Sequence, residues 1–231
     1  MNWSFIILEA EKPYLFLHKK MKYIGFLLIT TFCFHNNLYA QIGAAELYSG
    51  LNKTAFTSNA IIPIDEKGKF NFIGMGFYNF YHRDQDKLYN ETGLQTGVFY
   101  SFTKDFKLGL GLYANSTFGL QQRLVMNYTK KAGDFFILVA PAFAINKSTT
   151  TTEMVVDILY EKEIANNWNV YVKAFGMIAY DNFNTHARNF QQPRIGMGYK
   201  RKYFGFFADF DQWGSNLDSR SNYGLFAKIT F

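Results

Sequence analysis

From about residue 69 to the end of the chain, apolar residues alternate with polar or small residues, and each alternating segment is followed by a polar turn. A period of two places successive side chains on opposite faces of an extended chain, so the pattern predicts β-strands. No helical period interrupts the series. We therefore expect an all-β antiparallel fold with ten strands, although eight or twelve strands would also fit. The expected strands are residues 69–82, 92–103, 107–115, 122–130, 135–146, 153–163, 167–180, 193–200, 203–212 and 222–231.

The last expected strand shows its two faces most clearly. Its apolar face consists of Tyr223, Leu225, Ala227, Ile229 and Phe231. The other face is more polar and includes Asn222 and Lys228. In a soluble sandwich such an apolar face packs into the core, whereas in a transmembrane barrel it contacts lipid. Alternation alone leaves both architectures open.

The lengths of the connections favour the barrel. Short connections are expected at residues 104–106, 131–134, 164–166 and 201–202. Longer ones are expected at residues 83–91, 116–121, 147–152, 181–192 and 213–221. Short turns at one rim and longer loops at the other are typical of antiparallel transmembrane β-barrels of the bacterial outer membrane. Aromatic residues at expected strand ends fit the girdles of such barrels, namely Trp168, Tyr180, Tyr199 and Trp213.

The first forty residues have the pattern of an export signal. Met21 and Lys22 precede an apolar stretch at residues 23–34, and a polar stretch then leads to Ala40. This order predicts an N-terminal extension and a secretory signal peptide over residues 1–40, with a start at Met21 and cleavage after Ala40. We expect residues 41–68 to form a periplasmic N-terminal arm and residues 69–231 to form the barrel.

Composition excludes several other classes of protein. The chain has 231 residues, of which 48% are hydrophobic and 19% aromatic, with four prolines and a single cysteine. Neither a disordered chain nor a disulfide-rich miniprotein has this composition. The mean hydropathy is -0.13, and no apolar run reaches the roughly 18 residues of a spanning helix. The net charge of +6 is too small and too scattered to indicate a nucleic-acid partner.

The last strand also carries a resemblance to a known class of proteins. An alternating apolar strand that ends in Phe231 resembles the C-terminal assembly signal of bacterial outer-membrane proteins. The resemblance implies insertion by the barrel assembly machinery and contact with outer-membrane lipid. The richness in Asn, Lys, Phe and Tyr resembles that of Bacteroidota proteins. We therefore expect the bacterial outer membrane as the location.

Charged residues on the inward face predict a charged lumen. A loop at residues 164–166 places Asp157 opposite Lys173, and a turn at residues 201–202 places Arg194 opposite Asp209. Opposite charges would then meet in both pairs, as an enclosed interior requires. The other inward charges are expected at Lys107, Arg123, Glu161, Lys200, Asp211 and Lys228. A ten-stranded barrel with these side chains inside leaves no wide pore.

Signals of catalysis are weak. The run from Gly109 to Ala114 matches a dinucleotide-binding fingerprint, but it lies inside an expected strand, so we expect no cofactor. His82 and His186 have no matching acidic partners for a metal site. Asp209 and Asp211, with His82, resemble the catalytic groups of omptin proteases, although the sequence is Asp-Phe-Asp where that family pairs Asp with His. We expect no enzymatic activity.

Three functions follow from this picture. The first is a narrow channel that moves ions or a small solute through a charged lumen. The second is a closed structural barrel that docks an envelope partner through loops such as residues 181–192. The third is an outer-membrane hydrolase, either omptin-like or lipid-modifying.

Overall fold

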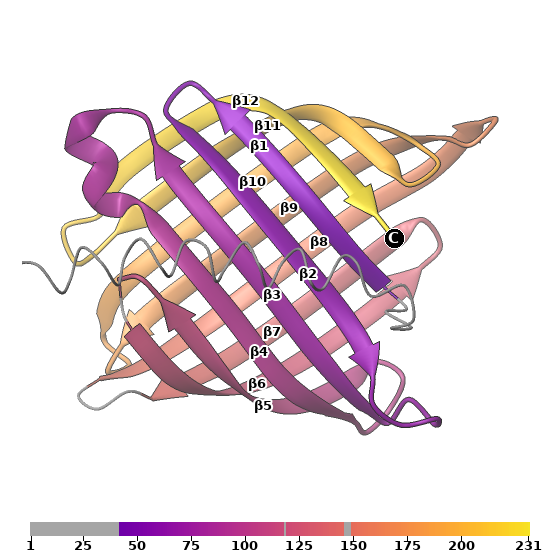
Figure 1. The fold of residues 1–231 in the computed structure, drawn as a ribbon, viewed down its shortest axis with the longest axis horizontal. Coiled ribbons are helices and arrows are strands. Elements are labelled where there is room, and N and C mark those ends of the chain that lie inside the picture. Colours follow the sequence, from indigo (N-terminus) through magenta and orange to yellow (C-terminus); the bar gives the residue numbers. More distant parts are fainter. Residues whose placement is uncertain (1–41, 118, 146–148) are drawn as a thin grey trace, which may run out of the picture. The chain divides into compact units, whose positions relative to one another are not determined.

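The computed structural model describes residues 42–117, 119–145 and 149–231. The predicted signal peptide and its cleavage after Ala40 lie outside the described residues. The described part forms twelve antiparallel strands that close into one barrel (Figure 1). The strands are β1 Ile42–Gly50, β2 Lys53–Pro63, β3 Phe70–Tyr81, β4 Glu91–Ser101, β5 Phe106–Asn115, β6 Gly119–Ala132, β7 Phe135–Ile145, β8 Thr150–Ala165, β9 Trp168–Asp181, β10 Thr185–Tyr199, β11 Lys202–Trp213 and β12 Asp218–Thr230.

The ten segments predicted from alternation correspond to β3–β12, but the predicted strand number of ten is wrong. The expected arm at residues 41–68 instead supplies β1 and β2, which complete the barrel. These strands have little contrast between their faces, because small or hydroxyl side chains such as Ala45 and Thr54 occupy many positions. Their period of two was therefore hidden in the sequence.

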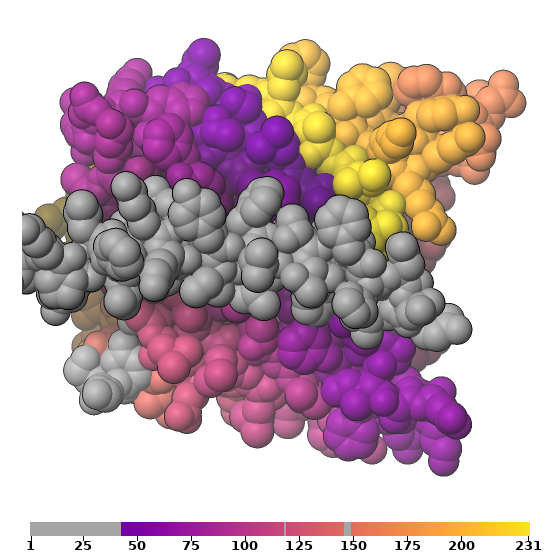
Figure 2. All heavy atoms as spheres, in the orientation of Figure 1, coloured from indigo at the N-terminus to yellow at the C-terminus, as the bar shows by residue number. Residues whose placement is uncertain are grey.

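The seam of the barrel joins the first described strand to the last. β1 pairs with β12, from Ala44 opposite Thr230 to Gly50 opposite Gly224, and with β2 on its other side. Figure 2 shows indigo atoms of the N-terminal strands directly beside yellow atoms of the C-terminal strand. Without β1 and β2, β3 and β12 would each be left with an unpaired edge.

The barrel has two ends, the terminal rim and the distal rim. The terminal rim carries Phe231 and the connections from β2 to β3, β4 to β5, β6 to β7, β8 to β9 and β10 to β11. The distal rim carries the other six connections between consecutive strands. The longest described connection at the distal rim joins β3 to β4 and contains the short 3-10 helix η1, Asp84–Tyr89. In the described part of the chain no helix has the length and apolarity needed to cross a membrane.

The predicted long loops at residues 181–192 and 213–221 are wrong. β9 ends at Asp181 and β10 begins at Thr185, with Asn182 and Phe183 at φ 49° and 67° in a tight turn. β12 likewise begins at Asp218. The polar residues that suggested loops remain paired within strands, because many of their side chains face the interior rather than solvent.

The turns also correct the predicted register. Asn166 and Asn167 form the turn from β8 to β9, with φ 47° and 68°, so Asp157 lies opposite Phe175 rather than Lys173. Lys200, with φ 56°, begins the turn from β10 to β11, so Arg194 lies opposite Phe207 rather than Asp209. Each misplaced turn shifted the predicted pairing by two residues, which preserved the faces but changed the partners.

Two glycines lie where β10 and β11 approach most closely. Gly196 is directly opposite Gly205. A Cβ on Gly196 would collide with the carbonyl oxygen of Phe204 and lie 2.9 Å from the Cα of Gly205. This contact requires glycine, which explains why small residues alternate with large aromatic ones on this face.

Candidate functional site

The interior of the barrel contains most of its buried charge. Inward-facing side chains that are almost fully buried include Glu46, Lys53, Glu91, Arg123, Arg194, Asp209 and Asp211. A buried charge is costly unless it is paired and hydrogen-bonded. The arrangement of the pairs is therefore the feature that can distinguish a channel from a closed barrel.

An arginine near the distal rim connects opposite walls. The Nη1 atom of Arg188 on β10 lies 3.0 Å from Oε2 of Glu91 on β4. Its Nε and Nη2 atoms donate to the two carboxylate oxygens of Asp211 on β11, at 2.9 and 2.7 Å. Five strands separate β10 from β4 in either direction around the barrel. The ion pairs of Arg188 therefore cross the lumen.

Neighbouring side chains support this bridge. Asn115 on β5 donates to Glu91 at 2.7 Å, and the hydroxyl of Tyr81 on β3 donates to Asp211 at 3.4 Å. The guanidinium of Arg188 lies 3.9 Å from the ring centroid of Trp213. Glu91 and Asp211 are only 1% and 2% exposed. Both carboxylates are thus shielded from water.

A second ion pair lies beside the bridge. Lys53 on β2 pairs with Asp209 on β11. The ammonium of Lys53 also lies 5.4 Å from the ring of Tyr81 and 5.3 Å from that of Phe190. The amide of Asn222 holds the start of β2, because it accepts from the backbone N–H of Lys53 at 3.2 Å and donates to its carbonyl at 3.0 Å. This cluster fills the space next to Arg188.

The connection from β3 to β4 folds against the inward residues of β11 and β12. Asp86 of η1 accepts a hydrogen bond from Nε of Arg220 at 3.1 Å. The guanidinium of Arg220 lies 3.4 Å from the ring centroid of Tyr89. The ring of Tyr89 contacts those of Tyr81 and Trp213, at 6.2 and 5.7 Å between centroids. The connection therefore packs over the residues that support the Arg188 bridge.

Deeper pairs involve the residues predicted from the sequence, in part with other partners. Lys173 lies 2.8 Å from Asp157 although the two residues are not directly opposite. Arg194 does not reach Asp209 and instead pairs with Glu46 on β1 at 2.5 Å. The predicted pair of Arg194 and Asp209 is therefore wrong.

The remaining predicted inward residues have several surroundings. Arg123 pairs with Glu153 at 2.6 Å, and Lys107 lies half-buried on the inward face of β5. Glu161 accepts from the hydroxyl of Tyr203 at 2.7 Å. The ammonium of Lys228 lies 5.1 and 5.4 Å from the rings of Tyr171 and Tyr203. Lys200 lies exposed in a turn at the terminal rim, so its predicted position in the lumen is wrong.

Exposure of inward side chains differs along the barrel. Lys53 and Asp209 near the distal rim are 3% and 1% exposed. Lys173 and Asp157 are 15% and 18% exposed, and the inward-facing Asn59 is exposed. Inward side chains in the terminal half are also buried, among them Tyr171, Tyr203 and Phe226. Water therefore reaches only the part of the interior around Asn59, Asp157 and Lys173. We use the term vestibule for the part of the lumen around Asn59, Asp157 and Lys173.

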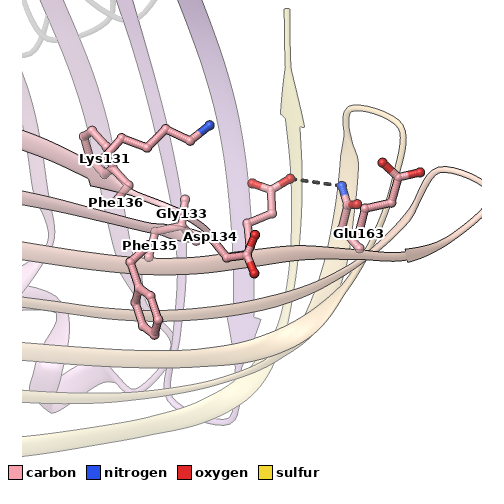
Figure 3. Close-up of a pocket in the computed structure, with 9 residues that line it drawn as sticks. Lys131, Gly133, Asp134, Phe135, Phe136 and Glu163 are labelled. Carbon is pink, nitrogen blue, oxygen red and sulfur yellow. Dashed lines mark hydrogen bonds between the residues drawn. The ribbon is translucent and has the colours of Figure 1, made fainter.

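A pocket of about 450 Å³ opens at the terminal rim (Figure 3). Asn169 in this pocket donates to Glu161 at 3.0 Å, shown by the dashed line in Figure 3. Through Glu161 the pocket adjoins Tyr203 at the base of the lumen. Its lining residues are Lys131, Gly133, Asp134, Phe135, Phe136, Leu159, Glu161, Glu163 and Asn169.

The candidate catalytic residues are not assembled. Asp209 and Asp211 pair with Lys53 and Arg188 inside the barrel. His82 lies elsewhere, with Nε2 3.0 Å from Oγ1 of Thr54. The run from Gly109 to Ala114 lies within β5. Over residues 42–117, 119–145 and 149–231, no group of three or more His, Cys, Asp or Glu side chains is placed to hold a metal ion.

The sequence prediction missed several residues of the lumen. Glu46 and Lys53 lie in the segment interpreted as an arm, and Arg188 lies in the segment interpreted as a loop. The period of two could have identified Arg188. It lies six residues before Arg194, so the two side chains fall on the same inward face of β10. No comparable local signal exists for a contact between β10 and β4.

Comparison with solved structures finds barrels of low similarity. The NanC porin is 8% identical, with 82% of this chain and 98% of that chain covered and a TM-score of 0.48. LpxR from Salmonella typhimurium is 9% identical, with coverage of 82% and 99% and a TM-score of 0.44. An outer membrane channel from Pseudomonas putida F1 is 8% identical, with coverage of 82% and 94% and a TM-score of 0.44. No model of a protein family and no curated protein matches this chain. These similarities carry no inference about activity.

Proposed function

We propose that this protein is a bacterial outer-membrane barrel whose lumen is closed, and that its role is structural rather than that of an open pore. One observation carries the proposal: the Arg188 bridge joins opposite walls through Glu91 and Asp211, whose exposed fractions are 1% and 2%. An aqueous channel of constant width would leave lumen carboxylates in contact with water. Here the distal part of the lumen is filled instead.

The distribution of polarity supports a position in the membrane. Large apolar side chains on the outer surface are highly exposed, including Leu110 at 70%, Phe206 at 67% and Ile195 at 60%. The interior holds the buried ion pairs. This is the reverse of a soluble sandwich and matches a barrel with an apolar outer band about 25 Å tall. Aromatic pairs near the terminal rim, such as Trp168 with Tyr199, fit an interfacial girdle.

The lipid-facing surface gives a first prediction. Leu110→Arg places a charge in the middle of β5 on the outer face and is expected to destabilise the inserted barrel by about 2–4 kcal/mol. Leu110→Met keeps the surface apolar and serves as the control. The folded fraction in phospholipid vesicles is read from the change in gel mobility on heating. Equal folded fractions for the two variants would contradict a lipid contact at Leu110.

A planar-bilayer recording tests the proposed closure. The purified wild-type protein is expected to give no stepwise current, provided that its heat-sensitive gel mobility shows correct folding. The charge-neutral Asp157→Asn and Lys173→Gln double variant is expected to be equally silent. Stepwise currents from the wild type that change in this variant would overturn the proposal.

A narrow channel for ions or a small solute is the second candidate function. The observation that favours it is the partial exposure of Asp157 and Lys173, at 18% and 15%, in the vestibule. The wild-type recording described above separates the two candidates, because only a channel gives stepwise currents.

Docking of an envelope partner remains compatible with a closed barrel, but the surface must differ from the loop predicted at residues 181–192. Deletion of residues 183–190 would remove part of β10 together with Arg188, and would test folding rather than docking. The connection between β3 and β4 is a better candidate, because Leu88 within it is 71% exposed. Co-purification with wild type but not with Leu88→Asp would support this surface.

A further inference from the structure

Positive charge is concentrated at one turn of the terminal rim. The turn from β10 to β11 and the first residue of β11 supply three consecutive exposed bases, Lys200, Arg201 and Lys202. The other connections at this rim have no excess of bases. Residues 64–69 and 102–105 each hold equal numbers of acids and bases, residues 133–134 hold a single acid, and residues 166–167 hold neither. The excess of positive charge in these turns therefore lies at one place.

These bases have no carboxylate at ion-pair distance in the described part of the chain. Lys200 donates its backbone N–H to the carbonyl of Asn167 at 3.0 Å, so the turn adjoins the hairpin of β8 and β9. Glu163 of that hairpin accepts from the backbone N–H of Asn167 at 3.1 Å. The charge of the turn is thus left without an acidic partner.

Aromatic rings lie on the outer surface beside the turn. Trp168 of β9 is directly opposite Tyr199 of β10, and their ring centroids are 5.2 Å apart. The ring of Phe204 on β11 lies 6.5 Å from that of Trp168. The three residues are 36%, 39% and 53% exposed in this order. Trp and Tyr on the outside of a membrane protein lie at the level of the lipid headgroups, which places the neighbouring bases at the depth of the lipid phosphates.

Two lysines connect the charge with these rings. The ammonium of Lys200 lies 5.3 Å from the ring centroid of Tyr199. Lys162 of β8 is exposed and lies opposite Val170, the next outward residue after Trp168 on β9. Bases and rings therefore share one surface. We call this surface the basic aromatic patch, and it consists of Lys162, Trp168, Tyr199, Lys200, Arg201, Lys202 and Phe204.

We propose that the basic aromatic patch binds an anionic phospholipid, with the bases at the headgroup phosphate and the rings against the glycerol and the upper acyl chains. Charge complementarity favours an anionic headgroup over a zwitterionic one, because a zwitterionic headgroup brings its own cation to the phosphate. The exposed rings favour a lipid over a soluble acidic partner. The inference rests on the membrane position proposed above and not on the closure of the lumen.

The patch faces the periplasmic leaflet. Short turns lie on the periplasmic side of outer-membrane barrels, and turns of two residues join β6 to β7, β8 to β9 and β10 to β11 at this rim. The described connections of the distal rim carry the bases Arg83 and Lys87 together with the acids Asp84 and Asp86. The described turns on that side therefore have no matching excess of positive charge.

Quenching of Trp168 fluorescence by brominated lipids measures which lipid lies beside the patch. Trp168 is on the outer surface, whereas Trp213 is inside the barrel and 9% exposed. The full chain is refolded in mixed vesicles of phosphatidylglycerol and phosphatidylcholine in which only one of the two lipids is brominated. Subtraction of the signal of Trp168→Phe isolates Trp168. We expect phosphatidylglycerol to be enriched beside Trp168 about fivefold, the factor for one basic side chain at an anionic surface.

Two triple variants of equal charge locate this preference. Lys200→Gln, Arg201→Gln, Lys202→Gln removes the bases of the turn and is expected to abolish the enrichment. Lys67→Gln, Lys69→Gln, Lys104→Gln removes three exposed bases elsewhere on the same rim and is expected to retain it. Inorganic phosphate is expected to change the enrichment no more than chloride at the same ionic strength. Loss in phosphate alone would overturn the proposal in favour of a soluble anion.

The remaining outcomes separate this inference from the position on which it rests. Equal quenching by the two brominated lipids in the folded wild type would overturn the proposal and favour a soluble acidic partner for these bases. An enrichment that both triple variants lose would also overturn it, because the preference would then belong to the charge of the whole rim. Absence of quenching by either lipid would instead contradict the membrane position of the barrel.

Discussion

Arg188→Met is expected to destabilise the barrel by about 3–5 kcal/mol, because it leaves two buried carboxylates without their cation. Glu91 and Asp211 both pair with this arginine, and they are only 1% and 2% exposed, so solvent cannot take its place. Unfolding by denaturant in detergent micelles or vesicles measures the change in the free energy of unfolding.

Two further variants identify the cause of this loss. The triple variant Arg188→Met, Glu91→Gln, Asp211→Asn removes all three charges and is expected to recover most of the stability, because no unpaired charge remains. Lys130→Met breaks the exposed pair with Asp105 and is expected to change little, since solvent screens such a pair. If the single Arg188 variant were as stable as the Lys130 variant, the bridge would not contribute to the stability of the barrel.

Deletion of residues 42–63 is expected to abolish the closed barrel. The deletion removes β1 and β2, so β12 and β3 would each present an unpaired row of backbone N–H and C=O groups. Such groups cannot be satisfied in lipid, which excludes an open sheet edge from the membrane. Loss of the heat-sensitive mobility on gels, together with aggregation on refolding, is the expected result.

The control for this deletion lies in the adjoining turn. Lys67→Ala changes an exposed residue between β2 and β3 and is expected to fold as the wild type does. The deletion also decides between two interpretations of this segment. A folded, heat-modifiable barrel that lacks residues 42–63 would mean that these residues are an arm after all.

The faces of the strands could be predicted from the sequence because they depend on a local property. Side chains alternate along any extended segment, so Leu110 and Leu225 were placed on the apolar face before any partner strand was known. The same reasoning failed for β1 and β2. Hydroxyl and small side chains occupy both of their faces, and no contrast remains to be detected.

The residues that lie opposite each other on neighbouring strands could not be predicted in the same way, since this pairing depends on single turn residues. Whether the turn from β10 to β11 begins at Lys200 or at Arg201 changes the residue opposite Arg194 from Phe207 to Asp209. Nothing in the local sequence distinguishes these registers, because both keep the apolar face toward the outside.

By itself, the sequence determined the all-β class, the antiparallel barrel, the positions of β3–β12 and the inward orientation of most of its charges. The tertiary structure alone decided how many strands close the barrel and which charges meet. The pairing of Arg188 with Glu91 joins residues 97 positions apart on opposite walls. Such a contact exists only once closure has set the width of the lumen, whereas alternation is already complete within each strand.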